Sequence, residues 1–265
     1  FKSDLDVIGY LIYGAMIIVP AIILSDKSIT REERSRIWVI FILAFFVIFF
    51  WSAFEQAGAS LTIFAERQTN RHLFNFEMPA SWFQSVNPLS IIVLAPLFSW
   101  LWGWLGKRNL EPASPKKMAI GLALLCLGYV VIAFAVKGVD STAKVAMWWL
   151  IALYVLHTMG ELCLSPIGLS MVSKLSPIRF SSLLMGTWFL ANAAANKLAG
   201  TLSALIPPGL GGEKVTGTVT YPSIIGYQIT NLYDFFMVFI VMTGIAAVIL
   251  FVLSGTLIKM MRGIR

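Results

Sequence analysis

Seven long apolar stretches dominate this chain, and each is about as long as a helix must be to cross a lipid bilayer. A membrane-spanning helix takes about 20 mostly apolar residues. The stretches cover residues 7–24, 37–65, 82–105, 118–136, 145–172, 182–206 and 235–258. Transmembrane barrel strands are shorter and alternate polar with apolar side chains, a pattern that these stretches lack. The sequence therefore predicts an all-α integral membrane protein that crosses the bilayer several times.

The composition excludes several other classes of protein. Hydrophobic residues make up 58% of the chain and charged residues 12%, and the mean hydropathy is +0.82. A soluble domain carries roughly 25% charged residues, so a soluble enzyme, a nucleic-acid-binding domain and a disordered chain are all poor interpretations. The net charge of +7 does not change this conclusion, because the basic residues gather in short connections between the apolar stretches. We therefore expect no nucleic-acid partner.

The distribution of basic residues predicts how the chain is oriented. Thirteen of the 20 lysines and arginines fall in one set of alternate connections and six in the other, with Lys197 inside a stretch. Positively charged loops tend to stay on the cytoplasmic side. The first set is therefore expected in the cytoplasm together with the C-terminus. The beginning of the chain is expected outside, which agrees with an odd number of spans.

Three stretches and one connection have features that differ from those of a straight lipid-facing helix and a short loop. Residues 37–65 and 145–172 are longer than a bilayer core of roughly 30 Å needs, so they should tilt, bend or extend past it. Pro88, directly after Asn87, removes a backbone donor where a helix could open. The connection 207–234 has a composition that permits a small β-hairpin.

Ionisable residues inside the spans are the first candidates for function. Such a residue costs about 2.5 kcal/mol or more on insertion scales, so its presence requires a reason. Glu161 falls near the middle of its span, where a carboxylate must face a cavity or a partner. It is either a functional group or a structural carboxyl bonded to a neighbouring helix. Glu55 falls in the outer half of its span, where it could close the outer mouth or face the interface.

Other polar and aromatic residues have plainer explanations. His157 shares a helix face with Glu161, but two side chains at this spacing lack the further ligands of a zinc site. A satisfied polar contact is the better interpretation for His157. Trp51 and Trp188 could be ordinary core aromatics in a chain with nine tryptophans. The sequence shows no nucleotide-binding or hydrolase fingerprint, so it predicts no cofactor, no metal and no enzyme.

Four segments of the chain have a distinctive sequence: FWSAFEQAGASLTIFAER (50–67), PASWFQSVNP (79–88), GELCLSPIGLSMVSKLSP (160–177) and GTWFLANAAANKLAG (186–200). The Gly-Glu-Leu…Ser-Pro stretch is the most specific of them. Together they resemble the proton-dependent oligopeptide transporters, a family of the major facilitator superfamily.

The resemblance implies the C-terminal half of such a transporter. Residues 37–258 would then form the C-terminal six-helix bundle of a major facilitator fold. Residues 1–36 would hold one preceding transmembrane helix of the inter-bundle linker and a cytoplasmic connection, and 259–265 a basic cytoplasmic tail. The implied partner is the N-terminal six-helix bundle. Its acidic and arginine motif, tyrosines and lysine are absent from this chain, so the proton-coupling groups here are incomplete.

The resemblance also assigns roles to individual residues. Glu161 matches the glutamate that meets the peptide amino terminus, and Asn87 an asparagine that contacts the peptide backbone. Trp51 and Trp188 match tryptophans of side-chain pockets. Glu55 matches an acid at the outer gate. Asn192 takes a position where relatives often carry another small polar residue. The resemblance therefore implies only that Asn192 is a further substrate contact.

The implied function is proton-coupled symport of di- and tripeptides across the bacterial cytoplasmic membrane by alternating access. The partners would be the peptide, protons, the lipid bilayer and the N-terminal bundle. An alternative is a related symporter for another small solute, such as nitrate or an amino-acid conjugate. A less favoured alternative is an intramembrane hydrolase that uses His157, Glu161 and Ser165, three residues on one helix face.

Overall fold

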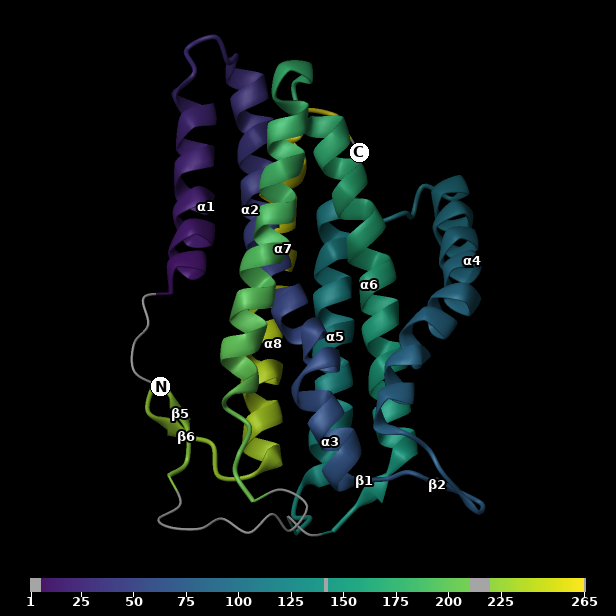
Figure 1. Ribbon diagram of the computed structural model, residues 1–265. Helices are drawn as coiled ribbons and strands as arrows, with labels where there is room; N and C mark the ends of the chain where they lie inside the picture. Colours follow the sequence, from purple (N-terminus) through teal and green to yellow (C-terminus); the bar gives the residue numbers. More distant parts are fainter. Residues whose placement is uncertain (1–5, 141–142, 210–219, 265) are drawn as a thin grey trace.

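Long helices form nearly all of this protein. The computed structural model describes residues 6–140, 143–209 and 220–264, and most of its helices run roughly along one direction (Figure 1). Its α-helices are α1 (Val7–Ser25), α2 (Arg31–Phe54), α3 (Ser60–Gln68), α4 (Val86–Lys107), α5 (Ser114–Val136), α6 (Met147–Leu175), α7 (Ser181–Ser203) and α8 (Leu232–Met260). The predicted all-α architecture is confirmed.

The predicted span of residues 37–65 consists of two helices with a break between them. A capping box of Thr30 and Glu33 starts α2 at Arg31, so the helix begins before the predicted residue 37. It ends at Phe54 and passes into the 3-10 helix η1 (Glu55–Gly58). Ala59 then leaves the helical region with φ −126° and ψ −103° before α3 begins. The bend expected in this span therefore begins at Glu55, where α2 passes into η1. The chain does not continue from α2 as a straight helix.

A second irregular segment leads into α4. Residues Ala80–Ser85 form the 3-10 helix η2, and the α-helix starts only at Val86. Asn87 and Pro88 are thus in the first turn of α4, where a missing backbone N–H costs nothing because that position has no helical acceptor. The predicted opening of the helix is found one turn before Pro88, as a change of helix type.

Helix α5 packs against α6 on one side and α8 on the other. Gly121 of α5 and Gly160 of α6 let the two backbones approach closely. A Cβ on either glycine would lie 2.7 Å from the carbonyl oxygen of the other. The fully buried Tyr129 donates a 2.6 Å hydrogen bond to the carbonyl oxygen of Ala53, which ties α5 to α2.

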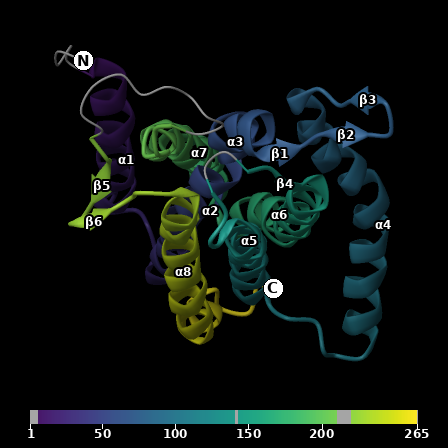
Figure 2. The same ribbon diagram turned by 90° about the horizontal axis from the view of Figure 1, so that it is seen from below.

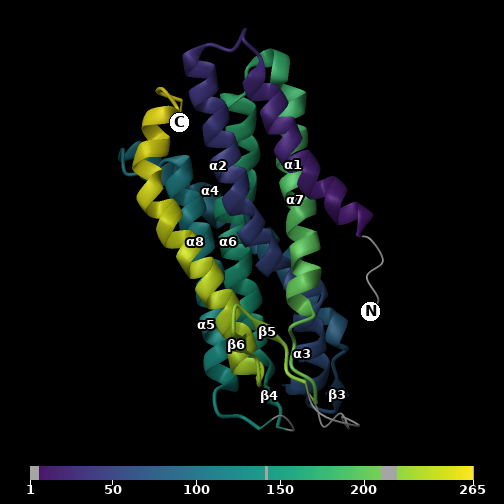
Figure 3. The ribbon, with the colours of Figure 1, turned by 90° about the vertical axis from the view of Figure 1, so that its left-hand side faces the viewer.

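Helix α1 packs on the outside of the group. It contacts α7 and crosses it at an angle (Figure 3), and only Gly9 and Ile23 of its 19 residues are buried. An ion pair of 2.7 Å joins Lys197 Nζ of α7 to Asp6 Oδ2 at the start of α1. This peripheral position is what a helix added to a six-helix bundle would show.

Helix α4 stands apart from the other helices. It makes most of its contacts with α6, and none of its described residues is buried (Figure 2). Exposed apolar side chains such as Ile92, Val93 and Trp100 cover it. An apolar helix that is exposed on most sides requires a lipid or protein environment.

Six stretches of the described residues are long and apolar enough to cross a membrane. They are Val7–Ser25, Arg31–Gln68, Ala80–Lys107, Ser114–Val136, Met147–Leu175 and Leu232–Met260. Helix α7 is not among them, because it carries polar side chains that include Asn192, Asn196 and Lys197. Six predicted spans are therefore confirmed by length and composition. The seventh stays a prediction, supported by the packing of α7 against α1 and α2.

Short strand pairs close the connections at one end of the molecule. Strand β1 (Thr69–Asn70) pairs in parallel with β4 (Val145–Ala146), and β2 (His72–Leu73) pairs with β3 (Phe76–Glu77). Strand β5 (Ser223–Ile224) pairs with β6 (Tyr227–Gln228), which confirms a small hairpin in the 207–234 connection. Residues 210–219 of that connection lie outside the described residues.

Candidate functional site

A polar group joins α4 to α6 in the middle of an otherwise apolar protein. The amide nitrogen Nδ2 of Asn87 donates to Glu161 Oε2 at 2.8 Å and to Thr158 Oγ1 at 3.0 Å. Thr158 in turn donates from its hydroxyl to the carbonyl oxygen of Tyr154 at 2.8 Å. Two residues predicted from the sequence are therefore brought together, although 74 positions separate them. One oxygen of the Glu161 carboxyl has a partner, and the residue is half-buried.

The local backbone explains how this group is held. Glu161 lies near the middle of α6, directly after Gly160, where α6 packs closely on α5. The change from η2 to α4 places Asn87 in the first turn of α4, where its side chain reaches α6. Thr158 lies three residues before Glu161, on the same face of α6. That spacing was a usable signal in the sequence, but we did not single out Thr158.

Glu55 lies close enough to Glu161 for the two carboxylates to interact electrostatically. It is half-buried at the start of η1, where the α2 backbone is interrupted. Two carboxylates that face one polar region repel each other when both are ionised.

Trp51 belongs to an aromatic group on the last turn of α2. Its ring lies edge-on to Phe54 at 5.1 Å and to Phe50 at 5.5 Å. Trp51 is half-buried, so part of its ring remains available for contact. Trp51 precedes Glu55 by four residues in the chain.

The two predicted site residues of α7 differ in their surroundings. Trp188 is 3% exposed, and its ring fills the space above Gly168 of α6, where a Cβ would lie 2.3 Å from Cζ2. In this conformation it packs α7 against α6. Asn192 follows one turn later, and its Oδ1 is buried without a hydrogen-bond partner among the described residues. A buried acceptor of this kind can take a donor from a ligand.

His157 is directed away from the Glu161 group. It is 1% exposed and its ring lies 4.9 Å from the ring of Tyr129 in α5. One side of the imidazole bonds the backbone of Leu125, while Nε2 has no partner within the described part of the chain. The expected satisfied polar contact is therefore only half realised. The arrangement does not bring His157 and Glu161 together as a catalytic pair.

Comparison with known sequences finds a family and several proteins to which this chain is similar. The profile of the POT family (PTR2) matches residues 5–209. The peptide transporter YePEPT of Yersinia enterocolitica is 40% identical over 73% of this chain and 38% of its own length. A di-/tripeptide transporter of Lactococcus lactis subsp. cremoris is 29% identical over 75% of this chain and 40% of its own.

Solved structures give the same result for the fold. A variant of a peptide transporter POT, crystallised in complex with alafosfalin, superposes with a TM-score of 0.82 and 31% identity. The alignment covers 97% of this chain and 48% of that chain. The chain therefore spans less than half the length of the relatives that it matches.

Proposed function

The chain belongs to the POT family, and from this membership we propose that it supplies the C-terminal half of a proton-coupled symporter for di- and tripeptides. In this proposal residues 37–258 form the C-terminal six-helix bundle. Residues 1–36 form a preceding linker helix with its connection, and 259–265 a basic cytoplasmic tail. The N-terminal six-helix bundle would face α4 and α6, and the substrate would bind between the two halves, as in other major facilitator proteins.

The observation that carries the proposal is the hydrogen bond between Asn87 and Glu161. A dipeptide carries an ammonium group at its amino terminus. The three N–H donors of this group make it a good partner for a carboxylate. The oxygen of Glu161 that does not bond Asn87 is suited to this role. The amide of Asn87 supplies a donor and an acceptor for the peptide backbone. Glu161 would bind the amino terminus, and Asn87 would hold its carboxylate and contact the peptide.

Side-chain recognition requires apolar surface that accepts many shapes. We assign this to the exposed part of the Trp51 ring and to Trp188 of α7. Because Trp188 is buried against Gly168 here, its contact with a side chain would need a shift of α7 relative to α6. The Oδ1 of Asn192 lies one turn along and has no hydrogen-bond partner in the described part of the chain, so it would accept a hydrogen bond from the substrate.

The proposal includes a location and an orientation. The chain would lie in the cytoplasmic membrane of a bacterium, with its C-terminus in the cytoplasm. The excess of lysines and arginines in one set of connections supports this orientation. Protons would move with the peptide, and the carboxyl groups of Glu55 and Glu161 are groups in this half that could exchange a proton.

Two other functions were considered. A symporter for another small solute would use the same fold, and the carboxylate at Glu161 disfavours an anion such as nitrate. An intramembrane hydrolase would need His157 and Glu161 in one group, but His157 packs on α5 while Glu161 bonds Asn87 on α4.

The test is uptake by proteoliposomes that hold the complete protein under an inward proton gradient. We expect accumulation of labelled dialanine that stops when the gradient is collapsed. Uptake of nitrate but not dialanine would favour the other symporter. Release of free alanine without accumulation would indicate hydrolysis.

We predict that this 265-residue chain alone does not accumulate peptide. A site at the bilayer midplane needs two facing halves for alternating access, and this chain provides one. Proteoliposomes that hold only this chain should show no gradient-dependent dialanine uptake, whereas the complete protein provides the positive control. Accumulation by the chain alone would contradict the two-half proposal.

We predict that Glu55 acts at the outer gate and not on the peptide. In the complete protein, Glu55→Gln should loosen the outward-closed state, because the gate would lose the negative charge of Glu55. Single cysteines in the outer cavity should then react faster with a membrane-impermeant maleimide, while dialanine affinity changes little. Unchanged reactivity together with lost dialanine binding would assign Glu55 to the substrate site with Glu161.

A further inference from the structure

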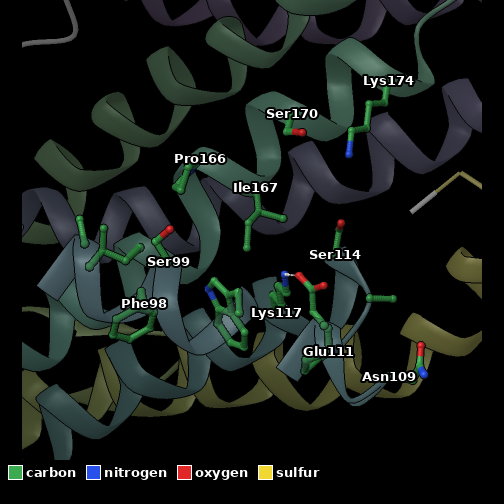
Figure 4. A pocket seen from close by; sticks show the side chains of 16 residues that line it. Phe98, Ser99, Asn109, Glu111, Ser114, Lys117, Pro166, Ile167, Ser170 and Lys174 are labelled. Atoms are coloured by element: carbon green, nitrogen blue, oxygen red, sulfur yellow. Dashed lines mark hydrogen bonds and ion pairs between the residues drawn. The ribbon is translucent and has the colours of Figure 1, made fainter. Parts of the chain in front are cut away.

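A polar cavity lies between α4, α5 and α6, apart from the Glu161 group. Its volume is about 640 Å³, and it is lined by the second half of α4, the loop before α5, the start of α5 and the end of α6 (Figure 4). Neither Glu161 nor Asn87 lines it. Its polar lining includes Trp102, Glu111, Ser114, Lys117, Ser170 and Lys174.

The charges around this cavity favour an anion. Lys117 is only 7% exposed, and its ammonium pairs with the Glu111 carboxylate while lying 4.6 Å from the centre of the Trp102 ring. Lys174 of α6 extends toward the same space (Figure 4). Among the residues that line the cavity, two therefore carry an ammonium group and one carries a carboxylate.

Hydrogen-bond donors in the lining point to the same kind of ligand. The indole Nε1 of Trp102 is buried and has no hydrogen-bond partner among the described residues. A buried donor without a partner costs free energy unless a ligand or water accepts its hydrogen. The first turn of α5 also begins here without a side-chain cap at Ala113, so the positive end of that helix adds to the field.

The position of the cavity indicates where the ligand comes from. Trp100 and Trp104 stack on the opposite, exposed face of α4, and Arg108 lies 4.0 Å from the centre of the Trp104 ring. Tryptophans together with basic residues at a helix end are typical of the bilayer surface. Basic pockets between helices at this level suit lipid headgroups.

We propose that this cavity binds the phosphate group of an anionic membrane phospholipid. The phosphate accepts hydrogen bonds from Trp102 and Lys174, while Lys117 supplies charge that Glu111 holds in place. The acyl chains lie along the apolar surface of the bundle. The bound lipid fastens α4, which otherwise packs mainly on α6, to α5.

The test compares two double variants of matched chemistry. Trp102→Phe with Lys174→Gln removes one donor and one charge from the cavity. Trp104→Phe with Lys116→Gln makes the same two changes outside it, since neither residue lines the cavity. Native mass spectrometry of the purified complete protein measures binding of phosphatidylglycerol and of phosphatidylcholine, with far-ultraviolet circular dichroism as the check on folding.

We expect the unchanged chain and the outside variant to retain one phosphatidylglycerol more tightly than phosphatidylcholine. The cavity variant should bind phosphatidylglycerol about tenfold more weakly, because a hydrogen bond to a charged group contributes roughly 1.5 kcal/mol or more. Equal affinity of the two variants would overturn the proposal. If the double variant does not fold, Lys174→Gln alone decides the question, because Lys174 is exposed and its replacement removes no buried side chain.

Competition with inorganic phosphate shows whether the ligand of this cavity is a lipid or a soluble anion. Millimolar phosphate should not displace phosphatidylglycerol, because the soluble ion lacks the apolar contacts of the acyl chains. Binding of inorganic phosphate in the absence of lipid binding would make this an anion site and overturn the lipid proposal.

Discussion

In the complete transporter, Glu161→Gln is expected to weaken binding of dialanine by about 10- to 100-fold, since a charged hydrogen bond contributes roughly 1.5–3 kcal/mol. The substitution keeps the size of the side chain and an oxygen that can accept from Asn87. It removes only the negative charge that the peptide ammonium would meet. Isothermal titration calorimetry of the purified protein measures this change directly.

A peptide with a blocked amino terminus is the matched control for Glu161→Gln. N-acetyl-dialanine has no ammonium group, so it should already bind weakly and lose little more on substitution. If both peptides lose the same factor, Glu161 does not recognise the amine, and its carboxyl serves only to join α4 to α6. Thr158→Val separates the two roles further, since it removes one acceptor of Asn87 and leaves the charge in place.

The second large effect concerns stability. Gly160→Ala should lower the free energy of unfolding by about 1–3 kcal/mol, the usual cost of adding a methyl group to a well-packed interior. The new Cβ would lie 2.7 Å from the carbonyl oxygen of Gly121, a backbone atom that cannot rotate away. The thermal midpoint of the purified chain, followed by tryptophan fluorescence, measures the loss.

Two further variants test this explanation. Gly255→Ala in α8 is the control, because nothing lies within 4 Å of its Cβ position, and it should leave the midpoint unchanged or slightly higher. Gly121→Ala should cost as much as Gly160→Ala, while the double variant should cost less than the sum. The first methyl group already separates the two helices, so the second meets less resistance. Strict additivity would mean that the two glycines act independently.

Several parts of this protein could be predicted from the sequence because they depend on local chemistry alone. An apolar run of about 20 residues is a membrane helix whatever surrounds it, since its backbone groups must bond within the segment. The polar residues inside those runs stand out for the same reason, and Glu161 and Asn87 were identified in this way. The length of residues 37–65 indicated that this span would tilt, bend or extend past the bilayer, and the composition of 207–234 permitted the small hairpin found there.

The position of the bend and the contacts between helices could not be predicted in this way. The break at Glu55 rather than elsewhere depends on the packing around Gln56, whose buried amide donates to the carbonyl oxygen of Ala199 in α7. Likewise, Trp188 was a candidate for a substrate pocket, and only the position of Gly168 shows that its ring packs in the core here.

The sequence by itself determined that this is a membrane protein of several helices with a carboxylate and an amide in its spans. The tertiary structure alone decided that Asn87 bonds Glu161, that Gly121 meets Gly160, and that His157 turns toward α5. The physical reason is that a membrane helix is apolar on every side, so its sequence carries little periodicity to indicate which face meets which neighbour. Those faces are chosen by close packing and by the few polar groups that must find partners in a medium without water.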